Sequence, residues 1–297
     1  MFLLTQFIGL YVVNHYSPIR VVDGVVQSVS SPSLPYGMET PELQNEQQYF
    51  ALFPFIIFAF IVAIVLMFIL SKFKIEFVMK LWFFIVVAIA LGISFNSVLT
   101  KLPYASLIAF LIALPLAFIK IYKRHFLVHN ITELLIYPGI AAVFVPILNI
   151  YTIIFLLILI SIYDIWAVWH SGFMQKMAKY QINQLKIFSG FFIPYTSKKV
   201  KEKIKNMKMS LKKSELKKKR IRINVAILGG GDVIFPIITA GVMLKTYGFL
   251  SAVFVIFGAA LGLFYLLIRS EKKKFYPAMP FITAGIFLGM ILFKVLF

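Results

Sequence analysis

The chain has 297 residues, of which 61% are hydrophobic and 14% are charged, with a mean hydropathy of +0.92 and a formal net charge of +19. It contains several uninterrupted apolar stretches of about 20 residues, long enough for a helix to cross a bilayer and without the alternation that a β-barrel would show. The chain has no cysteine, which excludes disulfides, thiolate catalysis and cysteine-ligated metals. We therefore predict an all-α polytopic membrane protein.

Nine apolar stretches are predicted to form transmembrane helices, numbered here as spans one to nine. The first, residues 1–13, is too short for a full crossing, and we interpret it as a span shortened at its N-terminus, because no basic region or small-residue cleavage site marks a signal peptide. Residues 17–48 are rich in proline, serine and acidic residues and predict an irregular external loop. The other spans are 49–70, 77–99, 102–122, 131–150, 152–169, 223–244, 249–268 and 277–297.

The long segment 172–222 divides the chain into a six-helix N-terminal part, residues 1–171, and a three-helix C-terminal part, residues 223–297. If the spans alternate in direction, 26 of the 30 Lys and Arg residues lie on one face of the membrane. The positive-inside rule makes that face cytoplasmic, so the N-terminus is predicted inside and the C-terminus outside. This bias explains the net charge without a nucleic-acid partner. Within the predicted cytoplasmic segment, residues 198–222 are predicted to be a solvated loop or a surface helix on anionic lipid, and we favour the loop.

Two aspartates lie inside predicted spans, where a carboxylate costs about 2.5–3.5 kcal/mol to insert and usually marks a functional site. Asp164 lies in span six, and Asp232 lies in span seven directly after Gly229, Gly230 and Gly231. At 1.5 Å per residue, the two carboxylates fall roughly 12 Å and 13 Å above the cytoplasmic edge of a ~30 Å core. We therefore expect a pair of carboxylates at one depth on consecutive antiparallel helices.

Such a pair supplies what the hydrolysis of an amide by water requires. Two carboxylates held close together can share one proton, so the ionised member takes a proton from water while the protonated member polarises the scissile carbonyl. The titration belongs to the pair, so neither aspartate is assigned a fixed acid or base role. A hydrogen bond between helices would explain one buried aspartate, but it explains two at one depth poorly.

The other titratable residues are interpreted more simply. Glu133 lies near the cytoplasmic end of span five beside His125 and His129, so we place it at the membrane interface. The four histidines lack the spacing of metal ligands, and we expect no metal or other cofactor.

Three motifs resemble those of a known family. Tyr163-Asp164, Gly229-Gly230-Gly231-Asp232 and Pro277-Ala278-Met279-Pro280 are similar to the YD, GxGD and PAL motifs of the presenilin and signal peptide peptidase family, particularly its archaeal members. The span count, the large loop and the orientation extend the resemblance over nearly the whole chain. In the third motif Met279 replaces leucine and a second proline follows, which we interpret as a variant. The resemblance implies a presenilin-like fold in the cell membrane of a prokaryote and an intramembrane aspartyl protease that cuts transmembrane segments of other proteins, with Asp164 and Asp232 as its catalytic pair.

The rest of the motif residues are predicted to bind the substrate. Gly229 would lie on the same helical face as Asp232 and admit the substrate backbone. Tyr163 would line the cavity or donate its hydroxyl to a carboxylate, and ordinary packing in the core is the alternative. The two prolines would keep an irregular backbone at the inner mouth of the site, although Pro277 suits a first helical turn better than Pro280 does. The predicted substrate-binding residues are Tyr163, Gly229, Gly230, Gly231, Pro277, Ala278, Met279 and Pro280.

A protease must also hold its substrate in an extended form. Residues 191–195 and 220–225 have a strand-like pattern, and one or both are predicted to form a β-edge that captures an unwound substrate helix. A disordered linker with an early start of helix seven is the alternative.

Two other functions are weighed. A proton- or cation-coupled transporter or channel also uses buried carboxylates, but we find no internal repeat. A prepilin-peptidase-like protease would place its second acid in an early cytoplasmic loop, where residues 72–80 offer only Glu76. Two glycine pairs, Gly258-x-x-x-Gly262 and Gly285-x-x-x-Gly289, are interpreted as helix-packing faces. The predicted partners are transmembrane-helix substrates and the lipid bilayer, and the oligomeric state is left open.

Overall fold

A computed structural model describes the chain except for residues 18, 23–24, 29–31, 42, 44, 74, 124, 171–179, 186, 196–223 and 271–275. Seven helical segments in the described part are long and apolar enough to cross a membrane: Glu46–Lys72, Glu76–Leu99, Ala105–Lys123, Phe126–Ile147, Ile150–His170, Phe249–Arg269 and Met279–Leu296. Two further helices, α1 (Phe2–Tyr16) and α10 (Gly231–Tyr247), are shorter. The prediction of a mostly helical polytopic protein is confirmed, and the count of nine spans stays a prediction.

The segments are divided into regular elements as follows. The N-terminal part contains α2 (Glu46–Lys72), α3 (Glu76–Leu99), α4 (Ala105–Phe118) with the π-turn Ile119–Lys123, α5 (Phe126–Phe144) with the 3-10 turn Val145–Ile147, and α6 (Ile150–Ile165) with the π-turn Trp166–His170. The C-terminal part contains α10, α11 (Phe249–Arg269) and α12 (Met279–Leu296). Between the two parts, a further π-helical turn spans Gln181–Leu185.

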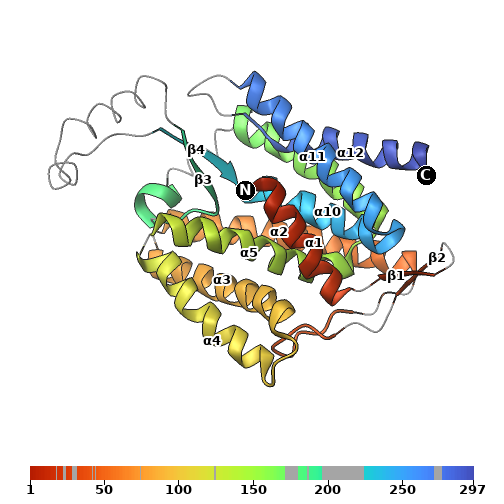
Figure 1. Cartoon of the computed structure of the whole chain (residues 1–297). Coiled ribbons are helices and arrows are strands. Elements are labelled where there is room, and N and C mark those ends of the chain that lie inside the picture. The colour runs from red at the N-terminus through yellow and green to blue at the C-terminus, as the bar shows by residue number, and fades with distance from the viewer. Residues whose placement is uncertain are drawn as a thin grey trace, which may run out of the picture.

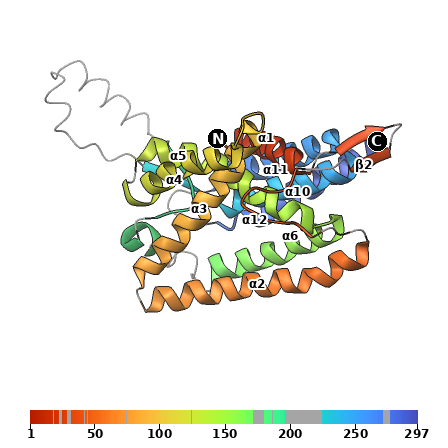
Figure 2. The same ribbon diagram turned by 90° about the horizontal axis from the view of Figure 1, so that it is seen from below.

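The outer surface of the bundle is apolar, as a lipid-facing surface must be. Phe55 on α2 is 70% exposed, and Leu261 on α11 is 62% exposed. Contiguous surfaces of this kind are not tolerated in water by monomeric soluble proteins. Helix α2 runs along one side of the bundle next to α6 (Figure 2), where Phe53 packs edge-on against Phe155 at 5.5 Å between ring centroids.

Helix α1 packs between α5 and α10 (Figure 1). It runs parallel to α10, since Gly9 lies against Ile237 and Val13 against Gly241. The side-chain amide of Gln6 donates to the carbonyl of Val233 over 3.0 Å. The first helix therefore supports the helix that begins beside Asp232.

Helices α11 and α12 pack with their backbones in contact. A Cβ added to Gly258 would lie 2.2 Å from the carbonyl oxygen of Gly285, and one added to Gly289 would lie 2.4 Å from that of Phe254. The predicted glycine packing faces are confirmed, because no side chain fits between the two helices.

Strands β3 (Gly190–Tyr195) and β4 (Asn224–Gly229) form an antiparallel ribbon beside α5 (Figure 1). Gly190 lies opposite Gly229, and Tyr195 lies opposite Asn224. The prediction that span seven runs as a helix over 223–244 is therefore wrong at its start. The chain is extended up to Gly229 because residues 224–229 pair with β3, and the glycines that follow, each disfavouring helix by about 1 kcal/mol relative to alanine, weaken an earlier helix start.

The loop after α1 and the start of α12 also differ from prediction. The loop 17–48 contains a hairpin, with β1 (Ile19–Val22) antiparallel to β2 (Val25–Ser28), where we predicted irregular structure. Its strands are rich in valine and isoleucine and flank Asp23-Gly24, a sequence typical of hairpin turns. Helix α12 begins at Met279 rather than at residue 277. The prediction for residues 198–222 lies outside the described residues.

Candidate active site

Asp164 lies in the last turn of α6 and is 6% exposed. The backbone N–H of Met279 donates to its Oδ2 over 3.0 Å, and the backbone of Ala278 also hydrogen-bonds to it. One turn earlier, the hydroxyl of Ser161 donates to Thr283 Oγ1 over 2.9 Å. The start of α12 therefore holds the carboxylate from a distant part of the chain.

The prolines of the third motif lie on either side of this contact. Pro277 precedes α12, and Pro280 is in its first turn. We expected the reverse, with Pro277 in the first turn. Proline is compatible with the first turn because backbone N–H groups there have no intrahelical acceptor. The N–H of Met279 is such a group, which leaves it free to bind Asp164.

Asp232 is the second residue of α10 and is half-buried. A Cβ added to Gly229 would lie 3.1 Å from its Oδ2, and the backbone of Gly229 also hydrogen-bonds to this carboxylate. We predicted that Gly229 would share a helical face with Asp232, and this is wrong because Gly229 is the last residue of β4. A helix N-terminus stabilises a negative charge, so the carboxylate lies where the local backbone favours it.

The structure brings the two carboxylates to one site. Helix α10 packs against α6 and α12, and the charges of Asp164 and Asp232 interact with each other. Tyr163 is half-buried, and its ring centroid lies 6.4 Å from that of Trp166. Among the described contacts, none joins the Tyr163 hydroxyl to either carboxylate by a hydrogen bond.

The other two glycines of the second motif differ from each other. Gly230 is buried, and its N–H donates to the carbonyl of Ser189 over 3.2 Å. A Cβ added to it would lie 2.9 Å from both Ser189 Oγ and the Tyr137 hydroxyl. Gly231 is exposed, and its nearest neighbour would be Phe235 at 3.8 Å. Gly230 is therefore packed, whereas Gly231 faces open space.

A second group of polar residues lies beside the site and was missed from the sequence. Glu133 is fully buried in an ion pair with Lys120, and His129 is 8% exposed. The prediction of an interfacial Glu133 is wrong because α5 begins at Phe126, which places Glu133 two turns inside the helix. The sequence did contain a signal for this ion pair. Lys120 and Glu133 have opposite charges and lie on either side of the short connection between two apolar spans.

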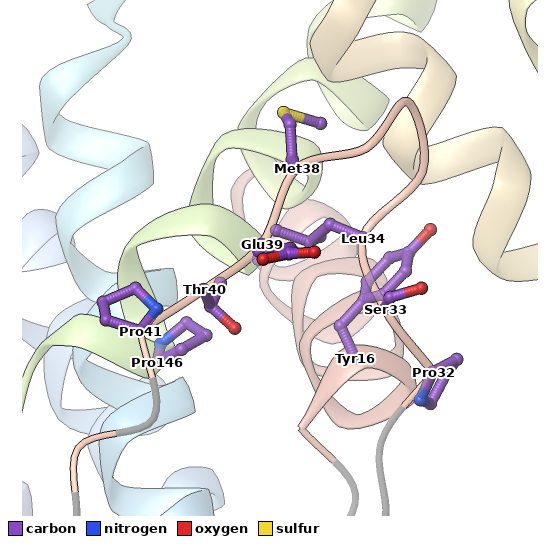
Figure 3. Close-up of a pocket in the computed structure, with 10 residues that line it drawn as sticks. Tyr16, Pro32, Ser33, Leu34, Met38, Glu39, Thr40, Pro41 and Pro146 are labelled. Carbon is purple, nitrogen blue, oxygen red and sulfur yellow. The ribbon is translucent and has the colours of Figure 1, made fainter.

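A cavity of about 650 Å³ lies elsewhere, between the loop residues 32–41 and the ends of α1 and α5 (Figure 3). Tyr16 lines it, roughly 15 Å along α1 from Gln6. Because Gln6 contacts the start of α10, this cavity is at the opposite end of α1 from Asp232 and is not the carboxylate site.

Known proteins resemble this chain in sequence and in fold. A protein-family profile described as "Signal-peptide peptidase, presenilin aspartyl protease" matches residues 24–297. A solved structure of a presenilin family intramembrane aspartate protease, in a P2 space group, is similar with a TM-score of 0.60 and 17% identity, over 100% of this chain and 95% of that one. Another such structure, in a C222 space group, gives 0.55 and 16%, over 99% and 98%. At these identities the structural likeness shows the fold. No curated protein sequence matches the chain.

Proposed function

Because the chain belongs to the signal-peptide peptidase and presenilin family of aspartyl proteases, we propose that Asp164 and Asp232 are the catalytic pair of this intramembrane protease. The observation that carries the proposal is the packing of α10, with Asp232 in its first turn, against α6, with Asp164 in its last turn. The alternative of a transporter is not favoured, since the family accounts for both carboxylates through one chemistry.

The pair would act through one shared proton. The ionised aspartate takes a proton from water as the water oxygen attacks the scissile carbonyl carbon, and the protonated aspartate gives its proton to the carbonyl oxygen. When the tetrahedral intermediate collapses, the C–N bond breaks and the leaving amine takes a proton from the pair. The N–H of Met279 binds Oδ2 of Asp164, and this donor would hold the carboxylate in place while the water reacts.

The predicted placement in the membrane belongs to the same proposal. We infer nine membrane helices, with α1 and α10 added to the seven long segments, the N-terminus in the cytoplasm and the C-terminus outside. The bias of Lys and Arg supports this orientation. The substrates would be transmembrane helices of other proteins in the plasma membrane of a prokaryote.

We further infer that an unwound substrate adds as a strand to the outer edge of β4, by which we mean the backbone groups that point away from β3. Gly230 donates to Ser189, and ladder bonds alternate along antiparallel strands, so the residues of β4 that point outward are Val225, Ile227 and Gly229. In the described part of the chain the sheet has two strands, and the Ile227 side chain is 47% exposed. A substrate strand at this edge would run directly to Asp232.

The catalytic pair is tested with purified protein in detergent and a single-span substrate. Asp164→Asn and Asp232→Asn should each lower cleavage by at least about a thousandfold, because each removes one half of a unit that works together. Elution volume and thermal unfolding check that both variants are folded. Cleavage that persists in both variants would overturn the assignment.

The substrate strand is tested by comparing Ile227→Pro with Ile227→Ala. Proline removes an N–H from the outer edge of β4 and leaves the bonds to β3 in place, while alanine changes only the side chain. One hydrogen bond contributes about 0.5–1.5 kcal/mol, so the proline variant should raise KM by about three- to tenfold more than the alanine variant. Equal KM values in the two variants would rule out strand addition at this position.

A further inference from the structure

Three side chains that can carry a charge are buried together next to the ribbon. Lys120, His129 and Glu133 are 6%, 8% and 0% exposed. The ammonium of Lys120 pairs with Glu133 Oε1 and lies 3.4 Å from Nδ1 of His129. A lysine ammonium only donates, so Nδ1 accepts and Nε2 of His129 carries the ring hydrogen.

This cluster binds both backbone groups of one residue of β3. Nε2 of His129 lies 2.8 Å from the carbonyl oxygen of Gly190 and donates to it. The N–H of Gly190 donates to Oε1 of Glu133 over 3.3 Å. Two residues later, the side-chain amide of Asn130 exchanges hydrogen bonds of 3.0 and 3.1 Å with both backbone groups of Phe192.

The side chains of α5 therefore cover the edge of β3 that faces away from β4. Gly190 and Phe192 are the alternate residues whose backbone groups point away from β4, and all four of these groups are bonded to α5. The ribbon thus has one edge closed by side chains, so a further strand can pair only at the outer edge of β4.

A short series of contacts links the cluster to the catalytic carboxylate. Gly190 pairs with Gly229, which in turn lies against Oδ2 of Asp232. Gly190 has a φ of +151°, and a Cβ there would lie 2.3 Å from the Leu228 carbonyl oxygen, so no other residue fits. The hydroxyl of Tyr137, one turn after Glu133 on α5, packs against Gly230. Any shift of Gly190 would therefore be passed to the residues next to Asp232.

We propose that Lys120, His129 and Glu133 are positioning residues that hold β3 by Gly190, and so fix both the Asp232 carboxylate and the strand on which the substrate lies. The inference rests on the proposed roles of Asp232 and β4. Stability alone explains the cluster poorly, since apolar residues of similar volume often replace a buried ion pair without loss. The backbone groups of Gly190 explain why polar atoms are placed there.

The decisive comparison is between two double variants, Lys120→Met with Glu133→Gln and Lys120→Met with Glu133→Leu. Both lack the ion pair and have the same charge, and they differ in the side-chain oxygen that accepts from Gly190. The glutamine variant should keep kcat within about threefold of wild type and cut the substrate at the wild-type positions. The leucine variant should lower kcat by about ten- to a hundredfold and spread the cuts over neighbouring bonds, as expected when reacting groups shift by about 1 Å.

Mass spectrometry of the products measures the cut positions, which a loss of folded protein alone would not move. Thr132→Val is the matched control, because Thr132 is fully buried on α5 but its hydroxyl bonds only to carbonyls of that helix. It should leave the cut positions unchanged. If the leucine double variant does not fold, His129→Leu removes the donor to the Gly190 carbonyl with the ion pair intact, and it should spread the cuts in the same way.

The outcomes separate this inference from the proposed function. Suppose first that Asp164→Asn and Asp232→Asn are inactive. Unchanged kcat and cut positions in the leucine double variant then overturn the positioning role. His129→Leu is judged in the same way if it replaces that variant. Cleavage that persists in both aspartate variants overturns the proposed catalytic pair, and with it this inference.

Discussion

The two aspartates are held in different ways. Asp164 is buried near the end of a helix and accepts a hydrogen bond from Met279, which lies 115 residues further along the chain. Asp232 is half-buried at a junction between a strand and a helix, with Gly229 from its own segment against it. The position of Asp164 therefore depends on the packing of α6 against α12, whereas that of Asp232 depends on the backbone of its own segment, which pairs with β3. Substitutions should separate the two.

The largest effect is expected at Gly229. In Gly229→Ala the new Cβ would lie 3.1 Å from Oδ2 of Asp232, so the carboxylate must move, and kcat should fall by about ten- to a hundredfold. Gly231→Ala is the control, because its Cβ would meet only Phe235 at 3.8 Å. It points to open space, so it should keep kcat and raise KM by a few fold at most. Steady-state kinetics measure both, and an unchanged kcat in Gly229→Ala would contradict the local account of Asp232.

The next effect is on stability and concerns Asp164. Asp164→Ala leaves the buried N–H of Met279 without an acceptor and should cost about 1–3 kcal/mol, while Asp164→Asn keeps an acceptor and should cost less. The same two changes at Asp232 should differ less from each other, since both Asp232 and Gly229, whose backbone bonds to it, are only partly buried. Thermal unfolding in detergent measures all four variants. If the alanine and asparagine variants differ in stability by the same amount at both positions, the two aspartates are not held in different ways.

A smaller effect is expected where α6 meets α12. Ser161→Ala and Thr283→Val each break the 2.9 Å hydroxyl bond, and each should destabilise by about 1 kcal/mol. The double variant should lose no more than the larger single loss, because both changes remove the same bond. Additive losses would show that the two hydroxyls act independently.

The smallest effect is expected for Met279→Leu. The change keeps the backbone N–H that binds Asp164 and nearly conserves the volume of a side chain that is 3% exposed, so it should cost less than about 1.5 kcal/mol. Cleavage should stay within about threefold of wild type. A large loss of activity would mean that the Met279 side chain itself contacts the substrate.

The sequence was sufficient for features that depend on local pattern. The seven long segments follow from uninterrupted apolar runs, and the contact between α11 and α12 follows from glycines spaced by four. Asp164 and Asp232 stand out because charges inside such runs are rare.

Features that depend on distant partners were harder to predict. The start of α10 was predicted eight residues early because Asn224–Gly229 is as apolar as a membrane helix, and only its pairing with β3 makes it a strand. Glu133 was placed at the interface because span five was predicted to begin at residue 131, and its partner Lys120 lies in another helical segment, where no local pattern reveals the ion pair. The bond from Met279 to Asp164 joins residues 115 positions apart that no local pattern connects.

The close contact of α11 and α12 has a mechanical consequence. Because the glycines bring the two backbones into direct contact at several positions, we expect α11 and α12 to move together. Met279 is the first residue of α12. A displacement of α11, even at a point far from either carboxylate, would therefore pull the hydrogen-bond donor away from Asp164 and loosen one half of the pair.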